Sequence, residues 1–141
     1  MAGSRQKARM VALQALYEAD LTHHSAVEAL NHLLQESRLS EGSQEIARRL
    51  VVGVAEHSQD IDKVLHASAP QWPVDQVAII DRNVLRLAIY EILFNNMERS
   101  VPSGVVINEA VDLAKRFGSE NSQRFVNGVL GSVSKIHLAA K

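Results

Sequence analysis

Apolar residues recur along this chain at the spacing of amphipathic helices. The first predicted helix, residues 5–21, carries two adjacent apolar stripes formed by Ala8, Ala12, Ala15, Leu16 and Ala19 and by Met10, Leu13 and Tyr17. Residues three and four positions apart lie on one face of a helix, so two stripes make a wide apolar surface. We therefore expect this helix to contact more than one neighbour.

Six further helices are predicted from the same spacing. They run from about 25 to 38, 43 to 57, 58 or 60 through 65, 75 to 96, 105 to 117 and 119 to 136. Ser25 and Glu28 have the spacing of a capping box, in which each side chain satisfies a free backbone amide of the first turn. Alternating strand-like runs are absent. The pattern therefore predicts an all-α fold of about seven helices.

Pro70-Gln-Trp-Pro73 is the clearest break in the pattern, because proline disfavours helix at the residue before it. We place a subdomain boundary there, with residues 1–72 and 73–141 forming two helical bundles packed into one compact domain. The helix predicted from 75 is apolar nearly all round. A helix of that kind is normally surrounded by neighbours, so we expect it to be central.

Two glycines carry specific expectations. Gly118 follows the sixth predicted helix and suits a left-handed C-terminal cap. Gly128 lies inside the seventh, where glycine costs roughly 1 kcal/mol relative to alanine. A glycine kept at that cost predicts the close approach of another backbone.

Composition and charge narrow the class of protein. The chain has 141 residues, no cysteine and a net charge of −1. No apolar run approaches the roughly 20 residues that span a bilayer, so the sequence predicts a soluble cytoplasmic protein with no membrane contact. The only cations in residues 1–17 are Arg5, Lys7 and Arg9, with one acid, Glu18, directly following that segment. Such a basic arm can contact phosphates, although three charges are a weak signal and a solvated helix end is the plainer interpretation.

Catalytic and metal-binding motifs are absent from the sequence. The six histidines do not stand in a zinc-binding frame, and no glycine-rich phosphate loop or nucleophile elbow occurs. We therefore predict a protein that is not an enzyme and that uses no metal or cofactor.

Three stretches of the chain together carry a family resemblance. They are residues 5–17, residues 80–91, and residues 106–115 followed by 124–130. In this order and at these separations they resemble the NusB family of transcription antitermination factors. The resemblance covers nearly the whole chain, with residues 22–73 matching least well.

The resemblance implies an all-α fold of two small helical bundles packed together. It implies a factor that binds the boxA element of nascent ribosomal RNA transcripts together with ribosomal protein NusE, within an antitermination complex on RNA polymerase. That activity is binding, without a bond made or broken.

The resemblance also implies an RNA-binding set. The arginine-rich N-terminal motif corresponds to Arg5, Lys7 and Arg9, with Gln6 where members often have another arginine. That departure predicts weak binding to RNA alone and more dependence on the protein partner. The three cations converge on phosphates only if the arm is extended, because a helix separates Lys7 from the other two.

Phe125 matches a family position at the RNA surface, where an exposed ring stacks on an unpaired base; a core phenylalanine is the alternative. Asn121 and Gln123, in the same turn, are candidate donors to phosphate or bases.

For the ribosomal protein, the resemblance points to Tyr17, Asp81 and Arg86. Asp81 stands where family members often have a glutamate. The aspartate keeps the negative charge, but its side chain is shorter. Tyr17 suits an interface through its apolar ring and polar tip, with core packing as the alternative. Asn108, Glu109 and Asn127 also match the family pattern, and we interpret them first as structural groups that cap or bridge helices.

Two other interpretations remain open. The fold also resembles the RNA-binding accessory domain of a family of ribosomal RNA cytosine methyltransferases, although no cofactor-binding strand or catalytic cysteine follows here. Alternatively, the chain is a helical interaction module that forms a homodimer through the broad first-helix surface.

Overall fold

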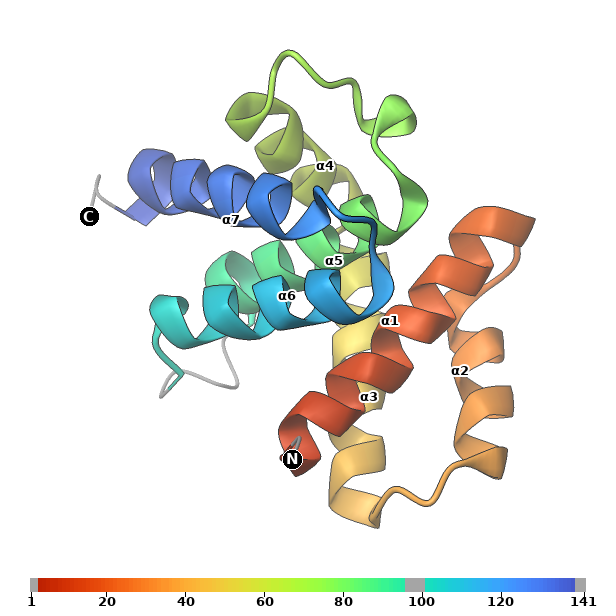
Figure 1. Ribbon diagram of the computed structural model, residues 1–141. Coiled ribbons are helices and arrows are strands. Elements are labelled where there is room, and N and C mark those ends of the chain that lie inside the picture. The colour runs from red at the N-terminus through yellow and green to blue at the C-terminus, as the bar shows by residue number, and fades with distance from the viewer. Residues whose placement is uncertain (1–2, 96–100, 139–141) are drawn as a thin grey trace. The chain divides into compact units, whose positions relative to one another are not determined.

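The computed structural model describes residues 3–95 and 101–138, and within them all regular structure is helical. These residues form seven α-helices, which confirms the predicted fold class. The chain divides into two compact units, Met1–Glu56 and His57–Lys141 (Figure 1).

The first unit consists of α1 (Ser4–Thr22), α2 (Ala26–Glu36) and α3 (Glu41–Glu56). The α1 helix packs against both α2 and α3, which accounts for its two apolar stripes. Ala8, Ala12 and Ala15 on this helix have no exposed surface. Alanine lets neighbouring backbones approach closely, so this wide face accommodates two partners without bulky side chains.

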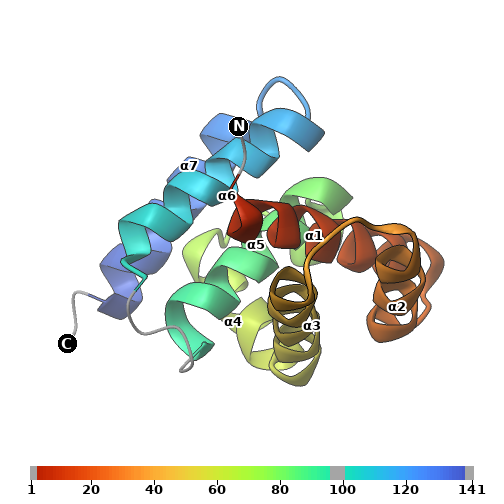
Figure 2. The same ribbon diagram turned by 90° about the horizontal axis from the view of Figure 1, so that it is seen from below.

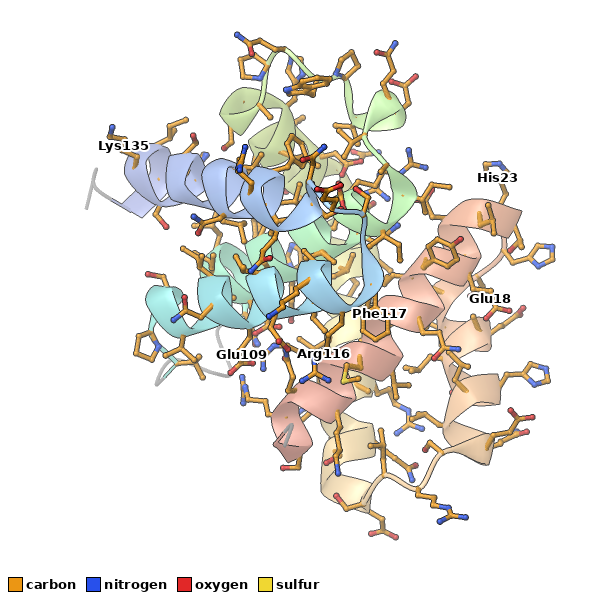
Figure 3. All side chains as sticks on the ribbon, in the orientation of Figure 1. Glu18, His23, Glu109, Arg116, Phe117 and Lys135 are labelled. Atoms are coloured by element: carbon orange, nitrogen blue, oxygen red, sulfur yellow. The ribbon has the colours of Figure 1, made fainter. Side chains whose placement is uncertain are left out.

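Local signals fix the turn between α1 and α2. His23, labelled in Figure 3, follows α1 in the left-handed conformation, with φ 60° and ψ 32°. The backbone amides of His23 and His24 both donate to the carbonyl of Ala19, closing the helix as a left-handed cap does. The Ser25 hydroxyl then accepts the backbone N–H of Glu28 at 3.3 Å, which is one of the two hydrogen bonds of the predicted capping box.

The second unit is built around one central helix. Its α-helices are α4 (Ser58–Ser68), α5 (Ile79–Ile89), α6 (Ser103–Phe117) and α7 (Ser122–Val133), with a 3₁₀ turn η1 (Val74–Gln76) and π-helical turns η2 (Tyr90–Phe94) and η4 (Ser134–Leu138). The α5 helix contacts α4, α6 and α7 (Figure 1). Val84, Leu85 and Ile89 on it are fully buried, which confirms the prediction of a central helix.

The two units divide between Glu56 and His57, one helix before the boundary that the sequence predicted after residue 72. The prolines do interrupt the helices, because α4 ends at Ser68 and η1 begins at Val74. However, α4 packs against both α5 and α7. The proline-rich segment is therefore a loop inside the second unit and does not link two bundles.

Gly118 and Gly128 differ from their predicted roles. Gly118 has φ −93° and ψ −166°, so it is not a left-handed cap. A Cβ there would meet the side chain of Ser122 and lie 2.7 Å from the carbonyl oxygen of Ala114, so lack of space requires glycine. Gly128 is exposed, and a Cβ on it would meet nothing within 4 Å. The predicted close approach of another backbone to Gly128 is therefore wrong within the described residues.

No helix among the described residues is both long enough and apolar enough to cross a bilayer.

Candidate nucleic-acid interface

An open polar pocket lies beside the junction of α6 and α7. Its volume is about 510 Å³, and it is lined by Asn108, Val111, Glu120, Asn121, Gln123, Arg124 and Asn127. Asn121 and Gln123 are the two amides that the sequence predicted for RNA binding, and the structure brings them to one site. The other polar members were not predicted as binding residues.

The helical hairpin of α6 and α7 creates this pocket. The two helices pack along each other, as both views of the ribbon show (Figures 1 and 2). Their short connection is closed by the Ser122 hydroxyl, which accepts the backbone N–H of Ser119 at 2.8 Å. Asn121, Arg124 and Asn127 follow at intervals of three residues, so they share one side of α7. Asn108 reaches the same pocket from α6.

The polar side chains of the pocket are available to a ligand. Within the described part of the chain, the side chains of Asn108, Asn121, Gln123, Arg124 and Asn127 form no hydrogen bond or ion pair with another residue. An amide side chain offers both donors and an acceptor, and arginine adds a cation with several donors. The interpretation of Asn108 and Asn127 as groups that cap or bridge helices is therefore wrong.

Phe125 lies beside this pocket but does not line it. The side chain is half-buried, between the two states that the sequence left open. Its ring meets that of Trp72 nearly perpendicularly, with centroids 6.2 Å apart and an interplanar angle of 83°. Trp72 itself is 54% exposed. Sequence analysis missed Trp72, whose one signal was its position between two prolines.

The basic arm of the first unit is helical and does not gather its three cations. Because α1 begins at Ser4, Arg5 and Arg9 lie on one face and Lys7 on another. Lys7 is exposed and Arg5 is half-buried, whereas Arg9 is only 2% exposed. The exposed cation of the predicted set is therefore Lys7, and Arg9 belongs to the buried side of α1.

The residues predicted for the protein partner differ in their surroundings. Tyr17, on α1, is half-buried. Asp81, on α5, is 7% exposed, and its Oδ1 oxygen has no hydrogen-bond partner among the described residues. Buried carboxylate oxygens are normally satisfied, so this oxygen is an exception to the rule.

Arg86 is held by its own unit. Its Nε and Nη2 atoms donate to the two carboxylate oxygens of Asp62 at 2.9 and 3.0 Å. Its Nη1 atom also donates to the side-chain oxygen of Asn83 at 3.4 Å. The bidentate geometry fixes the guanidinium in place, and Arg86 therefore links α5 to α4.

Residues 3–95 and 101–138 contain no cluster of three or more histidine or acidic side chains suited to a metal ion.

The fold is all-helical, and its pocket presents amide and arginine side chains that form no hydrogen bond within the described residues. These features place the chain in the class of small helical proteins that bind polar ligands. The chain belongs to the NusB family, whose model matches residues 6–135.

Curated relatives match this chain over nearly their whole length. The chain is 45% identical over 141 residues to the transcription antitermination protein NusB of Chloroflexus aggregans, covering 100% of this chain and 93% of the relative. It is 51% identical over 135 residues to the protein of the same name from Dehalococcoides mccartyi strain CBDB1, covering 96% and 92%.

Solved structures agree with the fold. NusB of T. maritima superposes with a TM-score of 0.88 and 36% identity, over 97% of this chain and 94% of that one. A chain from the crystal structure of antitermination factors NusB and NusE in complex with double-stranded RNA superposes with a TM-score of 0.86 and 30% identity, over 97% and 100%.

Proposed function

We propose that this protein is a transcription antitermination factor that binds the boxA RNA of ribosomal RNA transcripts together with ribosomal protein NusE. The observation that carries the proposal is the similarity to relatives of that name along 93% of the length of one of them. A similar chain has also been solved with NusE and RNA. The extent of the match to antitermination proteins favours this function over the methyltransferase accessory role.

On the second unit, the RNA surface comprises the polar pocket and the ring of Phe125. Unpaired bases in RNA expose edges rich in donors and acceptors, and proteins recognise them with matching hydrogen bonds. The free amides of Asn108, Asn121, Gln123 and Asn127 suit that role, and Arg124 suits a phosphate.

On the first unit, Lys7 and Arg5 supply the phosphate contacts. Each neutralised phosphate releases condensed counterions, which favours binding at low salt. The side chain of Gln6 is buried and carries no charge, and that of Arg9 is 2% exposed, so the arm offers few cations. We therefore expect weak affinity for RNA alone and a clear gain when the protein partner binds.

The NusE contact comprises Tyr17 and Asp81. Tyr17 is half-buried and combines an apolar ring with a polar tip, and tyrosine is one of the side chains enriched at protein interfaces. Asp81 keeps a buried oxygen unsatisfied, a cost to folding that a role in binding would explain. Arg86 contributes by holding α5 against α4 through Asp62.

The protein acts by binding, without chemistry on the RNA and without a cofactor. In the complex on RNA polymerase it suppresses premature termination of ribosomal RNA transcripts, and it therefore acts in the cytoplasm where those transcripts are made.

Fluorescence anisotropy of a labelled boxA RNA tests the proposal. The RNA and a scrambled control are each titrated with this protein alone and then with NusE present. We expect selective binding to boxA that tightens when NusE is added. Equal, weak binding to both RNAs, unaffected by NusE, would contradict the proposal and favour a homodimeric interaction module.

A further inference from the structure

Trp72 is an exposed aromatic side chain that the proposed function does not use. It is the only tryptophan of the chain, and 54% of its surface is exposed. Burying the largest apolar side chains is a main source of folding free energy, so an indole left in solvent contributes less than it could. This exposure points to a role outside folding.

The loop around Trp72 holds the indole in a defined place. Its backbone N–H donates to the carbonyl of Ala69 at 3.0 Å, which closes a tight turn after α4. Pro70 and Pro73 stand on either side, and their rings fix the backbone angle φ at both positions. The perpendicular contact with Phe125 then fastens the indole to α7. Such an aromatic ring is pre-organised, so little entropy is lost when a ligand binds to it.

The surroundings of the aromatic pair favour a nucleobase over an apolar protein segment. Phe125 directly follows Arg124, and Asn121 lies one helical turn before it. Both of these neighbours line the polar pocket, and their side chains form no hydrogen bond within the described part of the chain. Recognition of single-stranded RNA combines an aromatic face for stacking with polar groups for base edges and phosphates. Both requirements are met at the start of α7, where the Trp72 ring contacts Phe125.

We propose that Trp72 is a stacking platform for an unpaired base of the bound RNA. Phe125 is then a positioning residue that orients the indole, in addition to any contact of its own. This inference rests on the proposed RNA-binding function and adds a site from the α4–η1 loop to it.

The single tryptophan permits a direct test. The full-length protein is labelled with 5-fluorotryptophan, which gives one ¹⁹F resonance from position 72. Titration with single-stranded boxA RNA is followed by ¹⁹F NMR and, in parallel, by anisotropy of the labelled RNA. We expect the resonance to shift and to saturate together with the anisotropy.

Substitution at the same position measures the size of the effect. Base–aromatic stacking corresponds to about a 5- to 140-fold change in Kd. Trp72→Ala should weaken RNA binding within that range, and Trp72→Phe should keep much of the affinity because a ring remains. The salt dependence should stay unchanged in both variants, since stacking neutralises no phosphate.

A matched control moves the indole along the same unit. In the double variant Trp72→Phe/Ile136→Trp, the fluorinated indole replaces another exposed apolar side chain, in η4 beyond the C-terminal end of α7. Its resonance should not shift with RNA.

Several outcomes would overturn the inference. If anisotropy shows RNA binding but the resonance of position 72 does not shift, Trp72 does not stack on a base. An equal shift in the control variant would contradict the same role. Both outcomes would leave the proposed function intact. A shift caused by NusE alone and not by RNA would make Trp72 a protein anchor. Absence of RNA binding by anisotropy, with and without NusE, would overturn the proposed function as well.

Discussion

The guanidinium of Arg86 forms two parallel hydrogen bonds with the carboxylate of Asp62, from Nε to Oδ1 at 2.9 Å and from Nη2 to Oδ2 at 3.0 Å. The pair joins α5 to α4, and its two residues are 24 positions apart in the sequence. It therefore helps to place α4 in the second unit, ahead of the proline-rich loop. It also makes Arg86 a residue that organises the unit, whatever it contacts in a complex.

We expect Arg86→Ala and Asp62→Ala each to lower the free energy of unfolding by about 1–2 kcal/mol, between the values for an exposed ion pair and for a buried charged hydrogen bond. The double variant should lose less than the sum, because both substitutions remove one interaction. Urea denaturation measures all three. The exposed pair of Arg116 and Asp112 on α6, also 2.9 Å apart, is the control and should contribute less. Equal coupling in the two pairs would contradict the role assigned to Arg86.

Gly118 and Gly128 should respond to alanine in opposite directions. Gly118→Ala places a methyl group against Ser122 and the Ala114 carbonyl, so we expect a loss of about 1–3 kcal/mol. Gly128→Ala fills open space on a helix, so we expect a gain of up to about 1 kcal/mol. Thermal unfolding of the two variants decides. A stabilising Gly118→Ala or a destabilising Gly128→Ala would show that the surroundings of these residues differ from those described.

These two glycines show where sequence reasoning ends. The periodicity predicted seven helices and a central α5 correctly. The apolar spacing of a helix is a property of its own sequence, so it can be recognised without knowing which helices pack against it. The reason for a glycine is tertiary: Gly118 is crowded by Ser122, and Gly128 faces open space. No local pattern distinguishes the two cases.

The residues of the candidate site could be grouped from the sequence only in part, for the same reason. Asn121 and Gln123 lie in one turn and were expected together, whereas Asn108 comes from another helix and Asn127 from the next turns of α7. Only the packing of the α6–α7 hairpin brings them to one pocket. Likewise, the sequence placed Arg9 among the cations for RNA because its burial depends on the folded chain.

The difference in burial between Lys7 and Arg9 predicts different effects. Lys7→Ala should weaken RNA binding and reduce the slope of log K against log salt by about 1, with the unfolding transition unchanged. Arg9→Ala should lower the free energy of unfolding by about 1–3 kcal/mol, since a buried charged group loses its contacts. Anisotropy across a salt series, with circular dichroism melts, separates the two. If the Arg9 variant has normal stability and a reduced slope of log K against log salt, then Arg9 contacts a phosphate.

The amide pocket predicts a loss of RNA affinity without a loss of stability. Asn108→Ala and Asn127→Ala remove free, exposed amides, so their melting temperatures should stay close to that of the parent protein. If each amide recognises a base edge, boxA binding should weaken by about 1–3 kcal/mol, with a smaller change for the scrambled RNA. Gln59→Ala, an exposed amide on α4, is the matched control and should change neither quantity. Normal boxA affinity in both asparagine variants would exclude the pocket from the RNA surface.

Phe125 is half-buried, so its two possible roles separate in a pair of variants. Phe125→Ala should lower the free energy of unfolding by less than the roughly 3–5 kcal/mol of a core phenylalanine, and it should weaken RNA binding. Phe125→Leu keeps most of the apolar volume but removes the ring that meets Trp72, so stability should be nearly restored while RNA affinity stays reduced. Denaturation and anisotropy on the same preparations measure both quantities. If Phe125→Leu binds boxA as tightly as the parent protein, then the ring serves packing alone and contacts no base.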